Sequence, residues 1–196
     1  MPTALILYAS THGQTEKIAG YMAGRLRAQG VSARALDVQA AELPQRWAEI
    51  DGLYIGGALY VRRFQRALDA FIRQHRVALN AHPNAVFFSV SASAANAPGR
   101  EAVAALVDAY LASVGWRPKK CVHFAGAVKY PRYGPLTRWM MQRISRKEGG
   151  GVDTHCIYEY TDWGGGGRAA APAYAARIGV MRVHVSPSFR VSPGSA

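Results

Sequence analysis

The sequence predicts an α/β protein in which five parallel strands form one sheet, in the order 2-1-3-4-5, with helices on both faces. Short apolar runs alternate along the chain with stretches of helical periodicity. Strands that alternate with helices imply right-handed crossovers, and therefore a doubly wound parallel sheet. The chain has 196 residues, of which 49% are hydrophobic, which suits one domain with a real core and argues against disorder.

The first strand is the apolar run at residues 5–9, which ends in a turn rich in hydroxyl groups. A helix follows directly, because Ile18, Met22 and Leu26 recur on one face and Gly30 is a typical stop. A strand that turns into a helix in this way points several backbone N–H groups at one spot. The partial positive charge of the helix dipole adds to them.

The second strand fits residues 31–38, where apolar and polar residues alternate, and Pro44 breaks the segment that follows. The third strand, at residues 53–57, is short, apolar and closed by glycines. The remaining core elements are strands at 85–90 and 121–128 and helices at 64–79 and 101–114.

An insert of about thirty residues, at about 129–156, follows the fifth strand, and so long a connection is typically functional. Within it, residues 136–147 predict a short helix with arginines around an apolar face. That face carries Leu136, Trp139, Met140 and Ile144. Such a helix resembles an interfacial membrane helix. A helix packed on the domain with a solvated basic face is the alternative, and the pattern leaves both open.

The end of the chain departs from a regular final helix. Four glycines at 164–167 would weaken the start of such a helix, since each interior glycine costs about 1 kcal/mol relative to alanine. Residues 169–181 could still form a shortened helix. We therefore expect one domain at 1–183 and a flexible tail at 184–196.

The loop after the first strand is the strongest candidate site. It contains Ser10, Thr11, His12, Gly13, Gln14 and Thr15. It resembles the FMN-phosphate loop of flavodoxins, roughly [ST]-x-[ST]-G-x-T, with His12 in place of the middle hydroxyl. The resemblance implies a flavodoxin-like fold and a phosphate held without Lys or Arg. The alternative is an ordinary helix capped by Ser10 or Thr11.

Two further loops leave the carboxyl ends of the predicted strands, where ligands bind in such sheets. The second loop carries Tyr60, which could cover a flat ring, although a surface aromatic residue is the alternative. The third loop is rich in small and polar residues, so its backbone could form hydrogen bonds with the edge of a ring. The candidate residues of these two loops are Ala58, Leu59, Tyr60, Ser89, Val90, Ser91, Ala92 and Ser93.

The net charge of +12 favours nucleic acid, anionic lipid or acidic small molecules as partners. We expect no nucleic acid, because no recognised nucleic-acid motif is present.

Cys121 and Cys156 predict buried free thiols, with neither a disulfide framework nor a metal site. No signal peptide precedes the first strand and no apolar run reaches about 18 residues, so we expect a chain that is neither exported nor embedded.

A wider set of residues makes the resemblance more specific. The set is Gly13-Gln14-Thr15, Trp116-Arg117-Pro118, Gly126-Ala127, Tyr130-Pro131-Arg132-Tyr133, Arg138, Met140, Gly149-Gly150, Asp153-Thr154 and Tyr160-Thr161-Asp162-Trp163. Over residues 3–163 the chain resembles the quinone-dependent, flavodoxin-like protoporphyrinogen IX dehydrogenases of bacteria. That resemblance implies FMN, oxidation of protoporphyrinogen IX to protoporphyrin IX in haem biosynthesis, and menaquinone or ubiquinone as electron acceptor. It also implies a cytoplasmic protein attached peripherally to the inner face of the cell membrane.

The same resemblance implies a substrate role for the insert. Lys129, Arg132 and Arg138 could pair with the two propionates of the substrate, while Tyr130 and Tyr133 could stack on a tetrapyrrole or quinone ring. No residue stands out as a proton-transferring base, and an oligomer is possible. A soluble flavodoxin-type electron carrier is the alternative function, and a basic nucleic-acid-binding domain is a second, less favoured one.

The second loop departs from the family pattern, which tends to place its Tyr one position later and follow it with Gly. In this chain Val61 and Arg62 occupy those positions.

Overall fold

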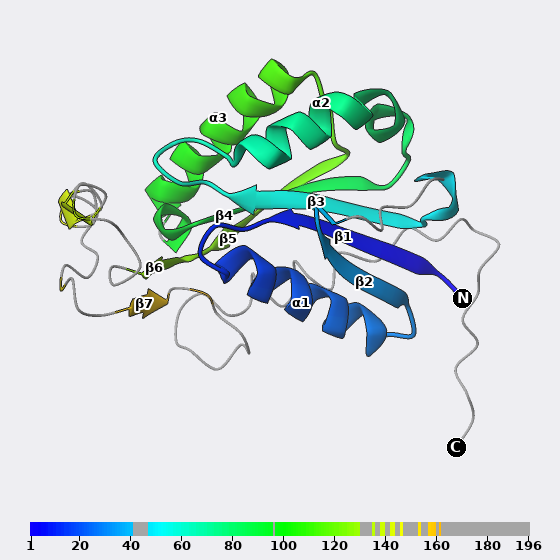
Figure 1. The fold of residues 1–196 in the computed structure, drawn as a ribbon, viewed down its shortest axis with the longest axis horizontal. Coiled ribbons are helices and arrows are strands. Elements are labelled where there is room, and N and C mark those ends of the chain that lie inside the picture. The colour runs from blue at the N-terminus through cyan, green and yellow to red at the C-terminus, as the bar shows by residue number, and fades with distance from the viewer. Residues whose placement is uncertain are drawn as a thin grey trace.

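The predicted sheet is confirmed by a computed structural model of the chain, in which five parallel strands lie in the order β2-β1-β3-β4-β5 (Figure 1). The structure describes residues 1–40, 47–95, 97–129, 135, 138–139, 142–143, 146, 153, 157–159 and 161. The strands of this sheet are β1 (Thr3–Ala9), β2 (Ser32–Asp37), β3 (Gly52–Ala58), β4 (Ala85–Ser91) and β5 (Lys120–Ala125).

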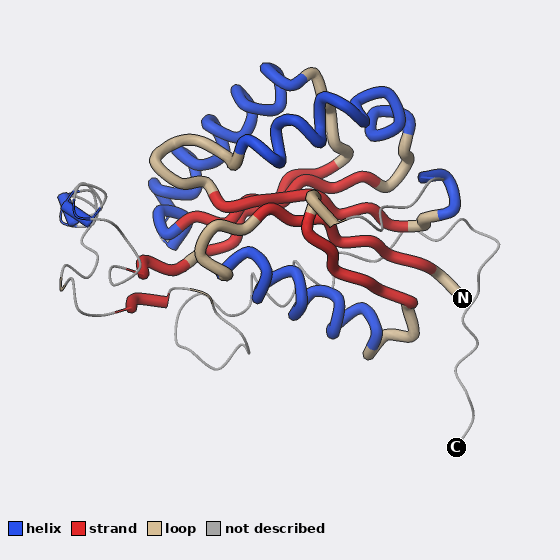
Figure 2. The backbone as a smooth tube through the Cα atoms, viewed as in Figure 1, coloured by secondary structure: helices blue, strands red, loops and turns tan. Residues whose placement is uncertain are grey.

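Helices cover both faces of the sheet, with α1 (Gln14–Arg27) on one side and α2 (Arg66–Ala81) and α3 (Ala97–Val114) on the other (Figure 2). The structure also has two short 3₁₀ turns, η1 (Trp47–Glu49) and η2 (Ala92–Ala95). α3 begins four residues before its predicted start, because a proline is tolerated in the first turn of a helix, where its missing N–H has no intrahelical partner.

The sheet separates two hydrophobic cores, because successive side chains of a strand point to opposite faces. Leu7, Ile55 and Phe87 lie in the core beneath α2 and α3, together with Trp116. Their strand neighbours Ile6, Tyr54 and Phe88 lie in the core beneath α1. Strands buried on both faces explain the continuous apolar runs of the sequence.

The glycines that end β3 let neighbouring elements approach closely. A Cβ atom on Gly56 would lie 2.0 Å from the carbonyl oxygen of Phe88, and one on Gly57 would lie 2.7 Å from Oε1 of Gln65. A larger residue at Gly56 would push β3 away from the β4 backbone, whereas one at Gly57 would displace the side chains of Gln65 and Leu68.

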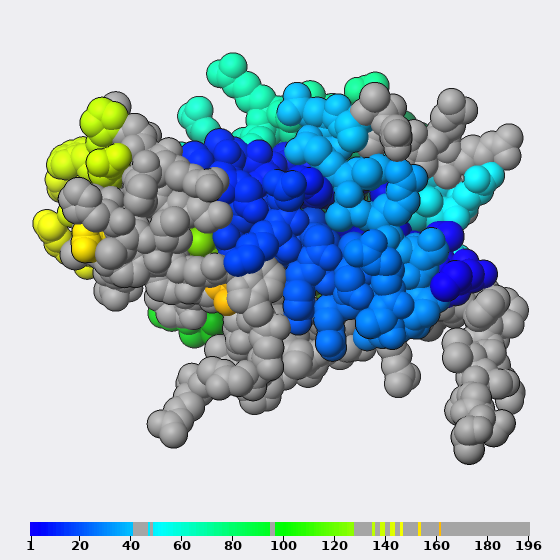
Figure 3. Space-filling view, turned by 60° about the horizontal axis from the view of Figure 1, so that its bottom comes forward, coloured from blue at the N-terminus to red at the C-terminus, as the bar shows by residue number. Residues whose placement is uncertain are grey.

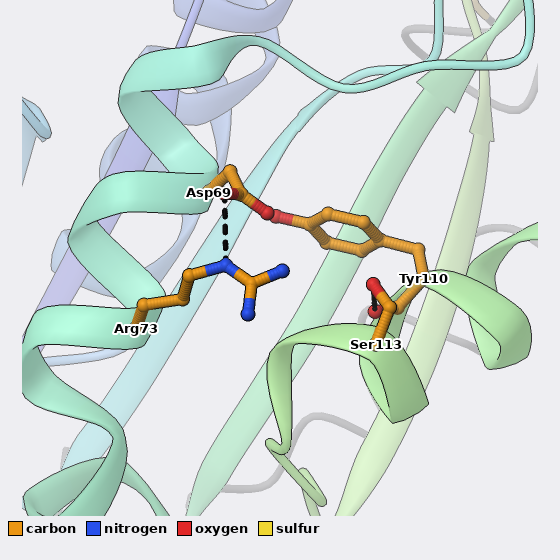
Figure 4. A network of polar contacts seen from close by, with 4 residues as sticks. All are labelled: Asp69, Arg73, Tyr110 and Ser113. Atoms are coloured by element: carbon orange, nitrogen blue, oxygen red, sulfur yellow. Dashed lines mark hydrogen bonds and ion pairs between the residues drawn. The ribbon is translucent and has the colours of Figure 1, made fainter.

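A polar contact marks the seam between α2 and α3 (Figure 4). Asp69 and Arg73 of α2 form an ion pair of 3.0 Å one turn apart, and Tyr110 of α3 points its hydroxyl toward Asp69. Burial raises the pKa of Tyr110, and the negative charge of Asp69 raises it further. The Tyr110 ring also packs on Phe64, which precedes α2, with ring centroids 4.5 Å apart.

The fifth strand ends earlier than predicted. β5 stops at Ala125, and residues 127–129 form β6 (Ala127–Lys129), which pairs antiparallel with β7 (Ile157–Glu159) in a separate two-stranded sheet. Gly126 lies between them, and its N–H donates to the Ser91 carbonyl at 3.0 Å. A Cβ there would lie 3.1 Å from Cγ1 of Val90. The predicted strand at 121–128 was therefore wrong at its end, because the chain turns out of the sheet at this glycine.

The two strands β6 and β7 form the base of the predicted insert and lie beyond the carboxyl end of the large sheet (Figure 1). The described residues between 135 and 146 lie at one end of the molecule (Figure 3). The described residues between 135 and 146 are helical, as predicted. The other residues of the 136–147 helix, the glycines at 164–167, the segment 169–181 and the tail at 184–196 lie outside the described residues. Within the described part of the chain, no helix combines the length and apolarity needed to cross a membrane.

Candidate functional site

The candidate site lies at the carboxyl end of the sheet, where the loops after β1, β3 and β4 come together. β1 has β2 on one side and β3 on the other, so the chain reverses its winding direction between them. Helices that follow β1 and β3 then leave to opposite faces and open a crevice at their starts. The site is therefore a consequence of strand order.

The first loop presents the start of α1 without a side-chain cap. The Gly13 N–H donates to Oγ of Ser10 at 3.0 Å, and Gly13 itself takes the N-cap position with a φ of 78°. None of the side chains that the structure describes caps the helix, so the expected alternative of a Ser10 or Thr11 cap was wrong. The first N–H groups of a helix carry partial positive charge and suit an anion.

Thr15 is the second residue of α1, so its surroundings indicate whether a phosphate fits at the helix start. The residue is 0% exposed, and its Oγ1 is buried with no hydrogen-bond partner among the described residues. A buried orphan hydroxyl costs about 1–3 kcal/mol unless a partner arrives. A phosphate oxygen at the helix start would be such a partner, so these residues fit the phosphate of FMN.

Gln14, the other buried residue at this turn, points its amide away from the loop. Its Nε2 donates to Oγ1 of Thr161 at 3.0 Å, and the Thr161 hydroxyl donates to the Ala125 carbonyl at 2.7 Å. Thr161 is only 8% exposed. No role for Thr161 was predicted from the sequence. The only sequence signal for Thr161 was its membership of the residues that resemble the dehydrogenase family. Its hydrogen-bond partner Gln14 lies 147 residues away in the chain, beyond the reach of local patterns.

The second loop is a tight turn that contacts the first. Backbone bonds join Tyr60 and Arg63 in both directions, at 2.9 and 3.0 Å. Val61 and Arg62 between them have φ values of 48° and 61°, which side-chain-bearing residues rarely adopt and which fit a type I′ turn. The turn sets the Tyr60 ring edge-on to His12, with centroids 5.8 Å apart.

A second link joins these loops through Gln65, whose Nε2 donates to Oγ1 of Thr11 at 3.3 Å. The Leu59 N–H donates to the Val90 carbonyl at 2.8 Å, which ties the second loop to the third. The residues of the first loop therefore lie next to Ala58, Leu59 and Tyr60. All three of these second-loop residues are partly exposed.

The third loop contributes less side-chain surface than expected. Ala92 and Ser93 lie in η2 and are partly exposed, whereas Val90 and Ser91 are buried. Ser89 lies inside the sheet at 0% exposure, with Oγ at 2.8 Å from Nδ1 of His123, its register partner on β5. The Ser89 hydroxyl is therefore bonded within the sheet, and the backbone around Ala92 and Ser93 is what the loop offers to a ligand.

The predicted substrate residues are described only in part. Arg138 is helical and half-buried, and Lys129 ends β6. Tyr130, Arg132 and Tyr133 lie outside the described residues. Nearby, Trp139 is 59% exposed, and the guanidinium carbon of Arg143 lies 5.8 Å from the centroid of its ring. Trp139, Gln142, Arg143 and Arg146 line one shallow hollow.

The three loops themselves carry only positive charge, while Glu16 follows them in the first turn of α1. The first loop, residues 58–65 and residues 89–99 contain no acidic residue, and Arg62 and Arg63 are exposed on the second loop. Among the described residues, no cluster of His, Cys, Asp or Glu could hold a metal ion. Cys121 on β5 is half-buried, and burial raises its pKa to about 11, which makes it a poor nucleophile at neutral pH. The arrangement suits an anionic ligand with a flat ring.

Comparisons with known proteins agree on one family. A family model described as Flavodoxin domain matches residues 5–155. A curated relative from Escherichia coli strain K12, called protoporphyrinogen IX dehydrogenase (quinone), is 35% identical over 160 residues, which are 81% of this chain and 87% of that protein. A relative of the same name from Leishmania major is 29% identical over 188 residues, which are 95% of this chain and 78% of that protein.

Solved structures with matching folds include a flavodoxin from the domain Archaea, with a TM-score of 0.46 and 15% identity, covering 78% of this chain and 95% of its own. Oxidised flavodoxin 1 from Bacillus cereus matches with a TM-score of 0.44 and 19% identity. The match covers 61% of this chain and 82% of the flavodoxin.

Proposed function

Since the chain belongs to the flavodoxin-domain family, together with relatives called protoporphyrinogen IX dehydrogenase (quinone), we propose that it is an FMN-dependent enzyme. Its substrate would be protoporphyrinogen IX and its electron acceptor a quinone, either menaquinone or ubiquinone. The observation that carries the proposal is the start of α1, where the helix has no side-chain cap among the described residues and the Thr15 hydroxyl is buried without a partner there. The product, protoporphyrin IX, places the activity in haem biosynthesis.

The residues of the three loops divide the binding of FMN between them. The N–H groups at the start of α1 and the Thr15 hydroxyl would hold the phosphate, and Gly13 keeps the loop in the required conformation. Tyr60, which packs against His12, would cover the flavin ring. The backbone at Ala92 and Ser93 would form hydrogen bonds with the edge of that ring. When bound, FMN supplies two-electron redox chemistry, and the protein orients it and tunes its potential.

The substrate is a dianion at neutral pH, which suits the positive rim of the site. Lys129, Arg132 and Arg138 of the insert would pair with its propionates, and Tyr130 and Tyr133 would stack on its ring. These contacts hold the substrate over the three loops rather than taking part in electron transfer. An electron carrier of the flavodoxin type would need none of them, so the insert supports an enzyme over a carrier.

The test begins with the absorbance spectrum of the purified chain, which should show bound flavin. The chain should then convert protoporphyrinogen IX to the fluorescent porphyrin without oxygen, and only when a quinone is added. Flavin without turnover under those conditions would favour the electron carrier. A spectrum with no flavin, even after incubation with FMN, would overturn the proposed function.

We also propose that the insert helix attaches the enzyme to anionic membrane surfaces at the cytoplasmic face, where a membrane quinone is available. Trp139 is 59% exposed, and Arg143 and Arg146 are exposed beside it. Burial of the indole among lipid chains and pairing of the arginines with headgroups would both favour binding. Each basic residue near such a surface contributes about 1 kcal/mol.

Co-sedimentation with vesicles that contain or lack anionic lipid tests the attachment at two salt concentrations. Binding should weaken with salt and weaken further in the Arg143→Glu, Arg146→Glu pair. Trp139→Ala should weaken it in a less salt-dependent way, because that contribution is apolar burial. The Arg25→Glu, Arg27→Glu pair on α1 changes the net charge equally and is the matched control. Equal binding by all variants would contradict the attachment.

A further inference from the structure

We propose that Thr161 is a positioning residue that couples the insert to the phosphate-binding loop, so that FMN and the insert hold each other in place. The inference rests on the proposed FMN site and adds a residue outside the three loops. It follows from two hydrogen bonds of one buried hydroxyl, and from where the ends of the insert meet the sheet.

The Thr161 hydroxyl uses both of its hydrogen-bonding functions. It donates to the Ala125 carbonyl at 2.7 Å and accepts from Nε2 of Gln14 at 3.0 Å. Ala125 is the last residue of β5, and Gln14 is the first residue of α1. One side chain therefore joins the exit of the insert to the strand from which the insert leaves and to the helix start proposed to hold phosphate.

The entry of the insert is tied to the same site from the other side. The Gly126 N–H donates to the Ser91 carbonyl at 3.0 Å, and Ser91 begins the third loop. β6 and β7 then pair from Ala127 with Glu159 to Lys129 with Ile157, so that only Tyr160 separates the paired ribbon from Thr161. The chain just before the insert thus contacts the third loop at Ser91, and the chain just after it contacts the start of α1 at Gln14.

This arrangement predicts a reciprocal coupling. A phosphate bound to the N–H groups of α1 holds the backbone of Gln14 in place, and the Gln14 amide in turn holds Thr161 and the end of the ribbon. Any free energy by which FMN steadies the insert must equal that by which the insert steadies FMN. Gln14 is buried, so the bond to Thr161 is shielded from water and is costly to leave unmade.

The test compares Thr161→Val, which keeps the shape and removes both hydrogen bonds, with Thr161→Ser, which keeps the hydroxyl. Two readouts are measured on the full chain: the dissociation constant of FMN, from the quenching of its fluorescence, and the cleavage of the Arg-rich insert by trypsin with and without FMN. Thr161→Val should weaken FMN binding about tenfold and abolish FMN-dependent protection of the insert. Thr161→Ser should restore both.

Thr3→Val is the matched control, because Oγ1 of Thr3 donates to the Glu49 carbonyl at 3.0 Å at the opposite end of the sheet. It should lower thermal stability without changing FMN affinity or protection. Should Thr161→Val fail to fold, Gln14→Leu breaks the same bond from the other partner and leaves the bond to Ala125 intact. It should then show the same two losses.

The outcomes separate this inference from the proposed function. A wild-type chain that binds no FMN overturns the proposed function and the coupling with it. A wild-type chain that binds FMN, with folded Thr161→Val and Gln14→Leu variants that bind it equally well and keep the protection of the insert, overturns the coupling alone. A Thr161→Ser variant as impaired as Thr161→Val would also overturn it, because the hydroxyl would then not be the cause.

Discussion

At the scale of single residues, Gly13 and Gly30 form a natural pair of test positions. They flank α1 at its two ends, both have a φ of 78°, and a Cβ at either would meet nothing within 4 Å. Valine at such a φ costs of order 1–3 kcal/mol of backbone strain. We predict that Gly13→Val and Gly30→Val lower the melting temperature by similar amounts, and that only Gly13→Val weakens FMN binding.

The reason for the difference is local, since Gly13 shapes the loop whose N–H groups would meet phosphate, whereas Gly30 ends the helix at its far end. Thermal unfolding and FMN titration of the two variants provide the comparison. An equal loss of affinity in both variants would mean that general destabilisation is the cause, and undiminished affinity in both would place the phosphate elsewhere.

Tyr54 provides a residue-scale prediction about pH. It is buried in β3, and burial raises its pKa to about 12. Above about pH 10 the unfolded chain releases this proton while the folded chain retains it, so stability falls as pH rises. The loss is up to about 1.4 kcal/mol per pH unit between pH 10 and 12. Urea unfolding at pH 9 and pH 11 should therefore show a smaller drop for Tyr54→Phe than for the wild type. Identical drops would show that Tyr54 ionises as readily when folded.

At the scale of elements, the five-stranded sheet whose loops form the proposed FMN site is separate from the two-stranded sheet of β6 and β7 at the base of the insert. We predict that deletion of residues 130–154, with the ends joined by a short glycine linker, abolishes porphyrinogen turnover but retains FMN. The three loops stay intact, and the deletion spares β6, β7 and Thr161, so the contact with Gln14 is kept.

Circular dichroism checks that the shortened chain folds, and flavin absorbance and turnover are measured on the same preparation. Loss of both FMN and turnover from a folded chain would mean that the middle of the insert is itself part of the flavin site.

At the scale of the whole molecule, the chain carries a net charge of +12, and the place of each charge relative to the site leads to a prediction about redox potential. A positive rim favours an anionic reduced flavin, and about 1.4 kcal/mol of such stabilisation raises a two-electron potential by roughly 30 mV. We predict that the Arg62→Gln, Arg63→Gln pair lowers the potential of bound FMN, and that the effect shrinks at high salt.

The Arg25→Gln, Arg27→Gln pair removes the same charge at the far end of α1 and should leave the potential nearly unchanged. The reduction potential of bound FMN is measured by redox titration of both double variants and of the wild type. Equal shifts in both pairs would show that total charge, rather than charge at the rim, sets the potential.

Much of this protein was determined by local sequence. The five strands, their order and the two layers of helices were predicted because apolar periodicity and glycine positions act within a few residues. The first loop was predicted for the same reason, since Gly13 and the start of α1 lie together in the chain. Tyr60 was also placed beside that loop, because parallel strands end at one edge of a sheet. That these residues bind FMN stays a prediction.

The tertiary structure decided what depends on partners distant in sequence. β5 ends at Ala125, and the Gly126 N–H that follows still donates to the Ser91 carbonyl of β4. The Ser89 hydroxyl is bonded to His123, which lies opposite it on β5. Gln14 points to Thr161, which lies 147 residues further along the chain. A buried hydroxyl or amide takes whichever partner the packed fold brings within reach, since leaving it unbonded costs more than most local preferences supply. Local periodicity carries no information about that partner.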